Sequence, residues 1–157
     1  MAVFVPGTRC PICGLQMTTD DEIIMFSPFV ANRLDPVFTF SDAAFHATCF
    51  AQHPLSAQAM EWHEESKRSV QPGNRICAVC GEPILDPDDY FGTGLLTSDR
   101  ANPLFEFNFV LLHRSHAGQW NRLGEFRRRV EEVQASDAWK GPKLVFGAGE
   151  TDVMRWI

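Results

Sequence analysis

The sequence predicts an α+β protein made of two tandem copies of one small unit, each organised around four cysteine and histidine side chains. Two observations indicate this. All five cysteines lie in short pairs with one another or with a histidine, and these pairs recur at equal spacing. Shifting the sequence by 67 residues superimposes one half on the other. A repeat of this period is typical of one supersecondary unit used twice.

The spacing of the pairs predicts two metal sites. In each half a C-x2-C pair is followed, after 32 intervening residues, by a second pair. The resulting groups are Cys10, Cys13, His46 and Cys49 in the first half, and Cys77, Cys80, His113 and His116 in the second. Cys3His and Cys2His2 are sets that tetrahedral zinc prefers. We therefore expect two structural Zn²⁺ ions per chain, which would staple units whose hydrophobic cores are small.

Residues between the ligands also coincide after the shift. They include Gly14 with Gly81, Arg33 with Arg100, Pro36 with Pro103, Phe38 with Phe105 and Phe40 with Phe107. The equal gap without insertion favours internal duplication over chance.

The two units are predicted to contain the same kinds of element in the same order. Residues 10–14 and 77–81 are typical of zinc knuckles, in which glycine tolerates the positive φ after the turn. Strands are predicted at 23–26, and at 37–40 and 104–109, where apolar residues alternate. A helix capped by Ser41 should then carry His46 and Cys49 on one face.

The remaining segments complete the predicted organisation. Pro54 should break the first helix before a second piece at 57–68, whereas the second unit should be helical over about 110–135. The predicted boundaries are 1–70 for the first unit, 71–137 for the second and 138–157 for a tail. The tail has a strand-like run at 144–146, and Trp139 and Trp156 should pack it on the body.

This order of knuckle, β-hairpin and helix resembles the treble-clef zinc finger, and two such units resemble a LIM-like double zinc finger. The resemblance covers about residues 8–135 and depends on the four ligand pairs. Both loops are longer than those of LIM fingers, and 27 residues separate the two ligand groups. A RING-type cross-brace also uses eight ligands in pairs, but the duplication argues for sequential sites.

Catalysis is not expected from these sites, because catalytic zinc needs an open coordination position. His116 is the weakest of the eight ligands, and its release would leave a three-ligand site. The H-x2-H pair is not the H-E-x-x-H signature of zinc proteases. The treble clef is also the scaffold of HNH nucleases, but both first-helix histidines are used as metal ligands here. His53 and His63 lie outside both groups and are expected to be ordinary core or surface residues.

Composition limits the compartment and the partners. No apolar run reaches the roughly 18 residues of a membrane helix, and the odd cysteine count favours a reducing, cytoplasmic location. The net charge is −6, and five thiolates with two Zn²⁺ would change it only to about −7. That charge disfavours a broad electrostatic hold on nucleic acid.

Two classes of function remain. The first is a non-enzymatic protein-protein interaction module of the adaptor, regulator or immunity-protein type. Its partner site is expected on the long loops at 22–36 and 89–103, because loops beyond minimal length on a rigid scaffold often carry function. The alternative is a nucleic-acid-binding or transcription-related protein that uses a basic helix face with Arg114, Arg122 and Arg128.

Overall fold

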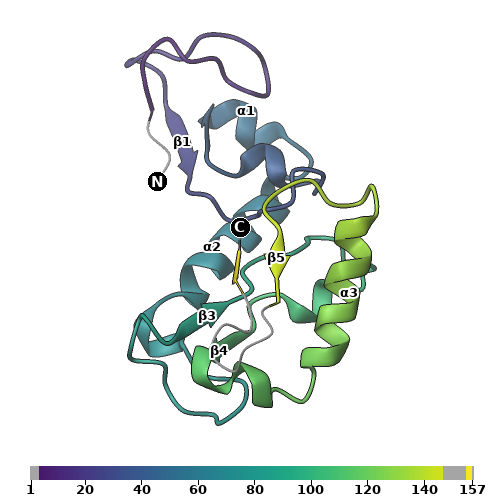
Figure 1. Ribbon diagram of the computed structural model, residues 1–157. Helices are drawn as coiled ribbons and strands as arrows, with labels where there is room; N and C mark the ends of the chain where they lie inside the picture. Colours follow the sequence, from purple (N-terminus) through teal and green to yellow (C-terminus); the bar gives the residue numbers. More distant parts are fainter. Residues whose placement is uncertain (1–3, 147–154, 157) are drawn as a thin grey trace.

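A computed structural model describes residues 4–146 and the backbone of residues 155–156, and Figure 1 shows its elements in chain order. We refer to residues 4–70 as the first half and 71–137 as the second half. The strands are β1 (Ile23–Phe26), β2 (Ala43–His46), β3 (Tyr90–Gly92), β4 (Leu111–His113), β5 (Leu144–Val145) and β6 (Arg155–Trp156). The α-helices are α1 (Ala47–Gln52), α2 (Ser56–Ser69) and α3 (Leu123–Ala135), and the 3-10 helices are η1 (Phe38–Phe40), η2 (Pro72–Asn74), η3 (Phe105–Phe107) and η4 (Arg114–Gln119). None of the described helices is long and apolar enough to cross a membrane.

Each half contains one antiparallel hairpin, and the two hairpins have the same register. Ile23 pairs with His46 in β1–β2, and Tyr90 pairs with His113 in β3–β4. Both pairs differ by 67 residues from one half to the other. The residue before β2 that takes a positive φ is Asp42 (55°), and its counterpart Phe109 has a φ of 57°. The two halves therefore share backbone detail as well as ligand spacing.

The predicted strands at 37–40 and 104–109 are wrong. Residues 38–40 and 105–107 form the 3-10 helices η1 and η3, and the second hairpin strand begins a few residues later. The side chains of Asp35 and Asn102 accept hydrogen bonds from the N–H groups of Val37 (3.0 Å) and Leu104 (2.9 Å). These turns start a tight helix instead of a strand, because Asp and Asn side chains compete for nearby backbone donors.

The predicted helix starts are also wrong. Ser41 caps no helix; its Oγ accepts hydrogen bonds from the N–H groups of Phe29 and Val30. The strand β2 follows, so His46 ends a strand and only Cys49 lies within α1. The continuous helix predicted at 110–135 is divided into β4, η4 and α3. The break at Pro54 is confirmed, since α1 ends at Gln52 and α2 begins at Ser56.

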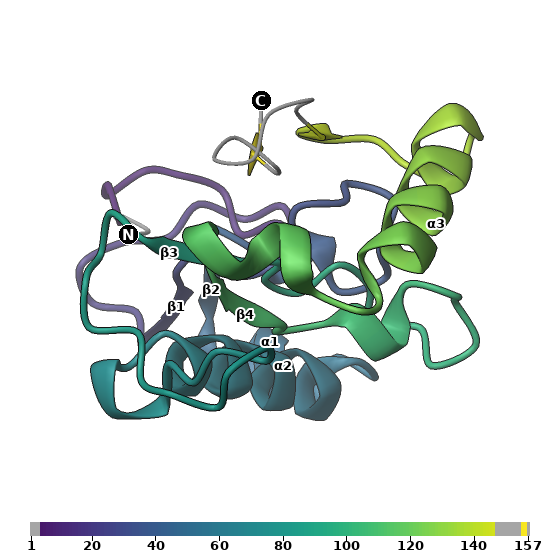
Figure 2. The same ribbon diagram turned by 60° about the horizontal axis from the view of Figure 1, so that its bottom comes forward.

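Each half has its own hydrophobic core. Phe26, Phe40 and Phe45 are completely buried in the first, and Phe107, Leu112 and Phe126 in the second. Helix α2 joins them, because Trp62 packs against Phe105 and Phe109 of the second half. Figure 2 shows α1 and α2 along one side of the two hairpins and α3 on the other.

The two long loops meet each other. Val30 and Leu95 form an isolated parallel bridge. The buried carboxylate of Asp35 accepts hydrogen bonds from the N–H (2.7 Å) and the hydroxyl (2.6 Å) of Ser98. These loops are longer than a zinc site requires, and part of their extra length therefore joins the two halves.

The tail closes over this junction. Asn32 exchanges hydrogen bonds with Ala138 O (2.9 Å) and Lys140 N (3.0 Å), and a Cβ on Gly141 would lie 2.3 Å from the carbonyl oxygen of Ala31. The short strand predicted near 144–146 is confirmed as β5, and Trp139 packs on the core of the second half. The side chain of Trp156 lies outside the described residues.

Replacing Asp35 tests the junction. Asp35→Ala leaves two donors of Ser98 without a partner, and a lost hydrogen bond to a charged group typically costs about 1.5–3 kcal/mol. Urea unfolding of the zinc-loaded protein should show a loss of that size. Asn102→Ala is the matched control, because it removes only the equivalent turn in the second half. Equal losses for the two variants would contradict a special role for the Asp35–Ser98 contact.

Candidate metal centres

The first group of ligands converges at the end of the β1–β2 hairpin. Cys10 and Cys13 come from the turn before β1, His46 ends β2 and Cys49 lies in α1. The four donor atoms lie within 4.8 Å of one another. The Nδ1 atom of His46 is 3.4 Å from Cys13 Sγ and 3.9 Å from Cys49 Sγ.

The second group is built in the same way. Cys77 and Cys80 precede β3, His113 ends β4 and His116 lies in η4, again with all four donor atoms within 4.8 Å. Cys80 Sγ lies 3.6 Å from His113 Nδ1, and Cys77 Sγ lies 3.8 Å from His116 Nδ1. The ligands thus gather sequentially, four from each half, and not in the interleaved manner of a cross-brace.

The knuckle turns place the paired thiols. Gly14 donates its N–H to Cys10 O (2.8 Å) at a φ of 74°, and Gly81 donates to Cys77 O (2.9 Å) at a φ of 76°. Residues with a Cβ seldom adopt this conformation, so glycine suits both positions. The hairpin pairing then brings His46 and His113 opposite the knuckles, because Ala47 and Arg114 donate to the carbonyls of Glu22 and Asp89.

The donor spacing fits a tetrahedral ion. Zn–S bonds of about 2.3 Å and Zn–N bonds of about 2.0 Å place neighbouring donors about 3.3–3.8 Å apart. The sulfur–nitrogen distances above span 3.4–3.9 Å. Soft thiolates with imidazole nitrogen also favour zinc over hard cations such as Mg²⁺. Both groups can therefore hold a metal ion of the zinc type.

Backbone donors prepare two thiols for metal binding. Burial alone would raise the pKa of Cys10, but hydrogen bonds from the backbone at Cys13, His46 and Ile12 outweigh it and lower the pKa to about 6. Cys77 behaves in the same way. Burial alone would raise its pKa, but hydrogen bonds from the backbone at Cys80, His113 and Val79 lower the pKa to about 6. Both side chains are therefore shifted toward the thiolate, the form that binds metal.

Cys49 differs from these two thiols. Desolvation, followed by the neighbouring thiols of Cys13 and Cys10, raises the pKa of Cys49 to about 11. Crowded thiolates repel one another, and a divalent cation removes this repulsion. A bound metal ion would therefore oppose the effects that raise the pKa of Cys49.

A carboxylate supports each centre, which sequence reasoning did not assign. Asp21 Oδ2 lies 3.7 Å from His46 Nε2 and accepts hydrogen bonds from the N–H and hydroxyl of Thr18. Asp89 accepts from the N–H (2.9 Å) and hydroxyl (3.0 Å) of Ser115, between the two histidine ligands. Such outer carboxylates orient metal-binding loops and imidazoles. The available signal was an acidic turn directly before the strand that pairs with each histidine.

The histidines outside the two groups have other partners. His63 is buried, its Nε2 lies 3.0 Å from the hydroxyl of Ser27, and burial lowers its pKa. His53 Nδ1 accepts the N–H of Leu55, and its ring meets Phe40 edge-on. Neither histidine belongs to a metal cluster of the described residues.

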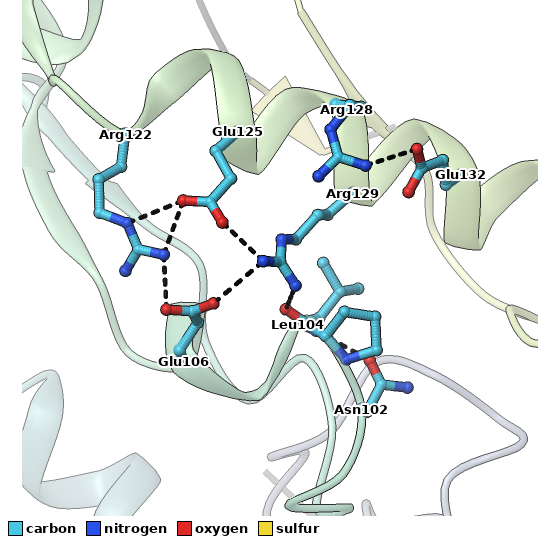
Figure 3. Close-up of polar contacts among 9 residues, drawn as sticks. Asn102, Leu104, Glu106, Arg122, Glu125, Arg128, Arg129 and Glu132 are labelled. Carbon is cyan, nitrogen blue, oxygen red and sulfur yellow. Dashed lines mark hydrogen bonds and ion pairs between the residues drawn. The ribbon is translucent and has the colours of Figure 1, made fainter.

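The basic helix face is largely neutralised by ion pairs. Figure 3 shows Arg122 between Glu106 and Glu125, and Arg128 on Glu132. Arg129 also contacts Glu125 (2.6 Å) and Glu106 (3.6 Å). Exposed pairs of this kind add little stability, but they cancel positive potential at the helix surface.

No protein-family model, curated protein or solved structure matches this chain.

Elemental analysis tests the metal content. Protein purified without added metal should contain two zinc ions per chain, because two complete donor sets are present. Acidification should release the zinc, since protons compete for the thiolates. Folded protein with a ratio near zero would contradict the assignment of the eight ligands.

Single ligand substitutions test whether the sites are separate. Cys10→Ser should lower amide protection mainly in the first half, and Cys77→Ser mainly in the second, because the ligands of each ion come from one half. Hydrogen exchange of the two variants measures this, with each serving as the control for the other. Equal loss across residues 8–135 in both variants would indicate a shared site.

Proposed function

We propose that this protein is a non-enzymatic, two-zinc interaction module built by duplication of a treble-clef unit. The observation that carries the proposal is that eight side chains form two separate four-donor sets with tetrahedral spacing. Four protein ligands close a zinc site, and closed sites are typical of structural metal.

The duplication is supported by hydrogen bonds that recur 67 residues apart. The knuckle bonds, the hairpin registers and the turns at Asp35 and Asn102 all have counterparts. One further pair of equivalent hydrogen bonds is less obvious from the sequence. Ser41 Oγ accepts the N–H groups of residues 29 and 30, and Asn108 Oδ1 accepts those of residues 96 and 97. Knuckle, hairpin and helix in this order are the parts of a treble clef.

A structural role at the second site is supported by the placement of His116. Its ring packs edge-on against His113 at 4.9 Å, and the next residue, Ala117, is buried in the core. Release of this ligand to open the site would therefore require η4 to move. A catalytic zinc at this site is disfavoured for that reason.

An interaction role is supported by the two long loops that the scaffold holds at the surface. The loops at 22–36 and 89–103 meet at the junction of the halves, and the exposed Leu34 (51% exposed) lies on the first of them. The paired arginines of α3 and the net charge of −6 weigh against nucleic acid as the partner.

Oligonucleotide binding tests the alternative function. At about 0.15 M salt, where the Debye length is about 8 Å, random single-stranded and duplex oligonucleotides should bind only weakly by fluorescence anisotropy. Each phosphate contact adds about −0.9 to the log–log salt slope, and few contacts are available to an acidic chain. Sub-micromolar binding that is lost when Arg114, Arg122 and Arg128 are replaced by alanine would favour the nucleic-acid function.

Capture from the native host tests the preferred function. Zinc-loaded full-length protein should retain a partner that Leu34→Glu no longer retains. Leu85→Glu is the matched control, because Leu85 is 82% exposed but lies outside both loops. Quantitative mass spectrometry compares the three baits. A partner set that is identical for all three would contradict a binding site on the loops.

A further inference from the structure

A cavity of about 520 Å³ opens where the two long loops meet. Residues 28–31 and 92–95 line it, together with Ser66 of α2 and Pro142 of the tail. Apolar atoms dominate the lining, and the charged members are Arg33 and Asp42. Its size lies within the roughly 300–1,000 Å³ typical of binding pockets.

The cavity wall has a counterpart in the second half. Its members Phe38, Arg33 and Asp42 correspond, after the 67-residue shift, to Phe105, Arg100 and Phe109. Helix α2 covers that counterpart surface. The indole of Trp62 stacks on Phe109 at 6.2 Å and meets Phe105 edge-on at 5.8 Å.

The residues around Trp62 complete this contact. Gln58 Nε2 donates to Ser98 O at 3.4 Å, and Glu61 lies 3.9 Å from Arg100. The counterparts of Ser98 and Arg100 are Ala31 and Arg33, which also line the cavity. Every residue of the second half that α2 touches in these contacts therefore has its counterpart at the open cavity.

Helix α3 does not fill the cavity in return. After the 67-residue shift, Arg129 of α3 corresponds to Trp62 of α2, and Glu125 corresponds to Gln58. These two side chains bind each other at 2.6 Å, and Arg129 also donates to Pro103 O. The repeated surface is thus covered by a tryptophan in one half and left open in the other.

We propose that the cavity is the docking site for an aromatic side chain, tryptophan above all, presented by a helix of a partner protein. This inference deepens the interaction function proposed above and depends on it. The chain itself shows the mode of binding, since α2 presents Trp62 to the equivalent surface. Tryptophan is also among the residues that most often dominate the binding energy of protein interfaces.

The charges at the rim complement such an anchor. Arg100 lies over the ring of Phe105, with its Cζ 5.6 Å from the centroid, and their counterparts Arg33 and Phe38 both line the cavity, where Arg33 supplies a cation beside an incoming ring. Asp42 replaces Phe109 and supplies an acceptor for an indole N–H or a basic neighbour of the anchor. Among the described residues, Arg33 and Asp42 have no side-chain ion pair or hydrogen bond.

The floor of the cavity is fixed before anything binds. Ser41 Oγ accepts the N–H groups of Phe29 (3.0 Å) and Val30 (3.3 Å), and Thr93 Oγ1 donates to Phe107 O at 2.7 Å. A preorganised site loses less conformational entropy on binding.

Among the described residues, no exposed aromatic side chain of a second copy could supply the anchor. Trp62 is only 8% exposed, because it already covers the second half. The large exposed apolar side chains of the described residues are aliphatic, namely Val5, Leu15, Met25, Leu34, Val70, Ile76 and Leu85. The proposal therefore takes a different protein as the partner.

The chain's own helix provides a probe. A capped peptide of residues 56–69, and its Trp62→Ala version as the control, are titrated into zinc-loaded full-length protein labelled with ¹⁵N. The native peptide should shift amide signals of residues 29–33 and 92–95 and bind about tenfold tighter than the control, or more. Equal affinities, or shifts confined to other surfaces, would overturn the proposal. Amide shifts that appear without peptide as the protein concentration rises would instead identify self-association and would also overturn the proposal.

Filling the cavity from within gives an independent test. Ser66→Trp places an indole into the cavity from α2 and should abolish peptide binding while the protein keeps two zinc ions. Lys67→Trp is the matched control, since Lys67 is exposed and does not line the cavity. Unchanged binding by Ser66→Trp would overturn the proposal. Arg33→Glu, at an exposed position, should weaken binding several-fold without loss of stability.

The same variants distinguish failure of the aromatic anchor from failure of the interaction function. If the host partner is lost with Leu34→Glu but retained by Ser66→Trp, the interaction function stands and the aromatic anchor is wrong. If neither variant changes the captured partners, the loops are not the binding site and the interaction function itself fails.

Discussion

Convergence of four donor side chains on one point is the constraint on which each half depends. The donors come from a turn, a strand end and a helix, so their meeting fixes these elements relative to one another. Cys10 and Cys77 are each 1% exposed, and their thiolates need a positive partner in that environment. Several features position the donor side chains at this point. They are the hairpin register, the knuckle glycines and the outer carboxylates of Asp21 and Asp89.

The two halves are alike in construction but differ in what their surfaces contact. Helix α2 crosses to the second half and buries Trp62 there, whereas α3 packs on its own half through the buried side chains of Phe126, Val130 and Val133. The Asp35–Ser98 bonds and the tail then hold the halves together around a cavity. The duplication that we propose, followed by unequal packing, would explain how one surface is covered and its counterpart is open.

The chemistry that the protein can offer follows from this arrangement. Thiolate-rich, four-donor sites stabilise structure and leave no coordination position for a substrate. The described surface includes the loop junction, where apolar cavity walls lie beside the charged side chains of Arg33 and Asp42. Binding, and not turnover, is the function that we propose for this surface.

The sequence by itself determined the ligand groups, because their spacing is a local and repeated pattern. It also determined the strand at Ile23–Phe26 and the helix break at Pro54, where a short apolar run and a proline act over a few residues. It failed at Val37–Phe40, because alternating phenylalanines suit a strand until Asp35 captures the N–H of Val37. Only the tertiary structure decided that Glu106 neutralises Arg122, that Trp62 covers the second half and that a cavity remains in the first. These contacts join residues far apart in the chain, and no local pattern records them.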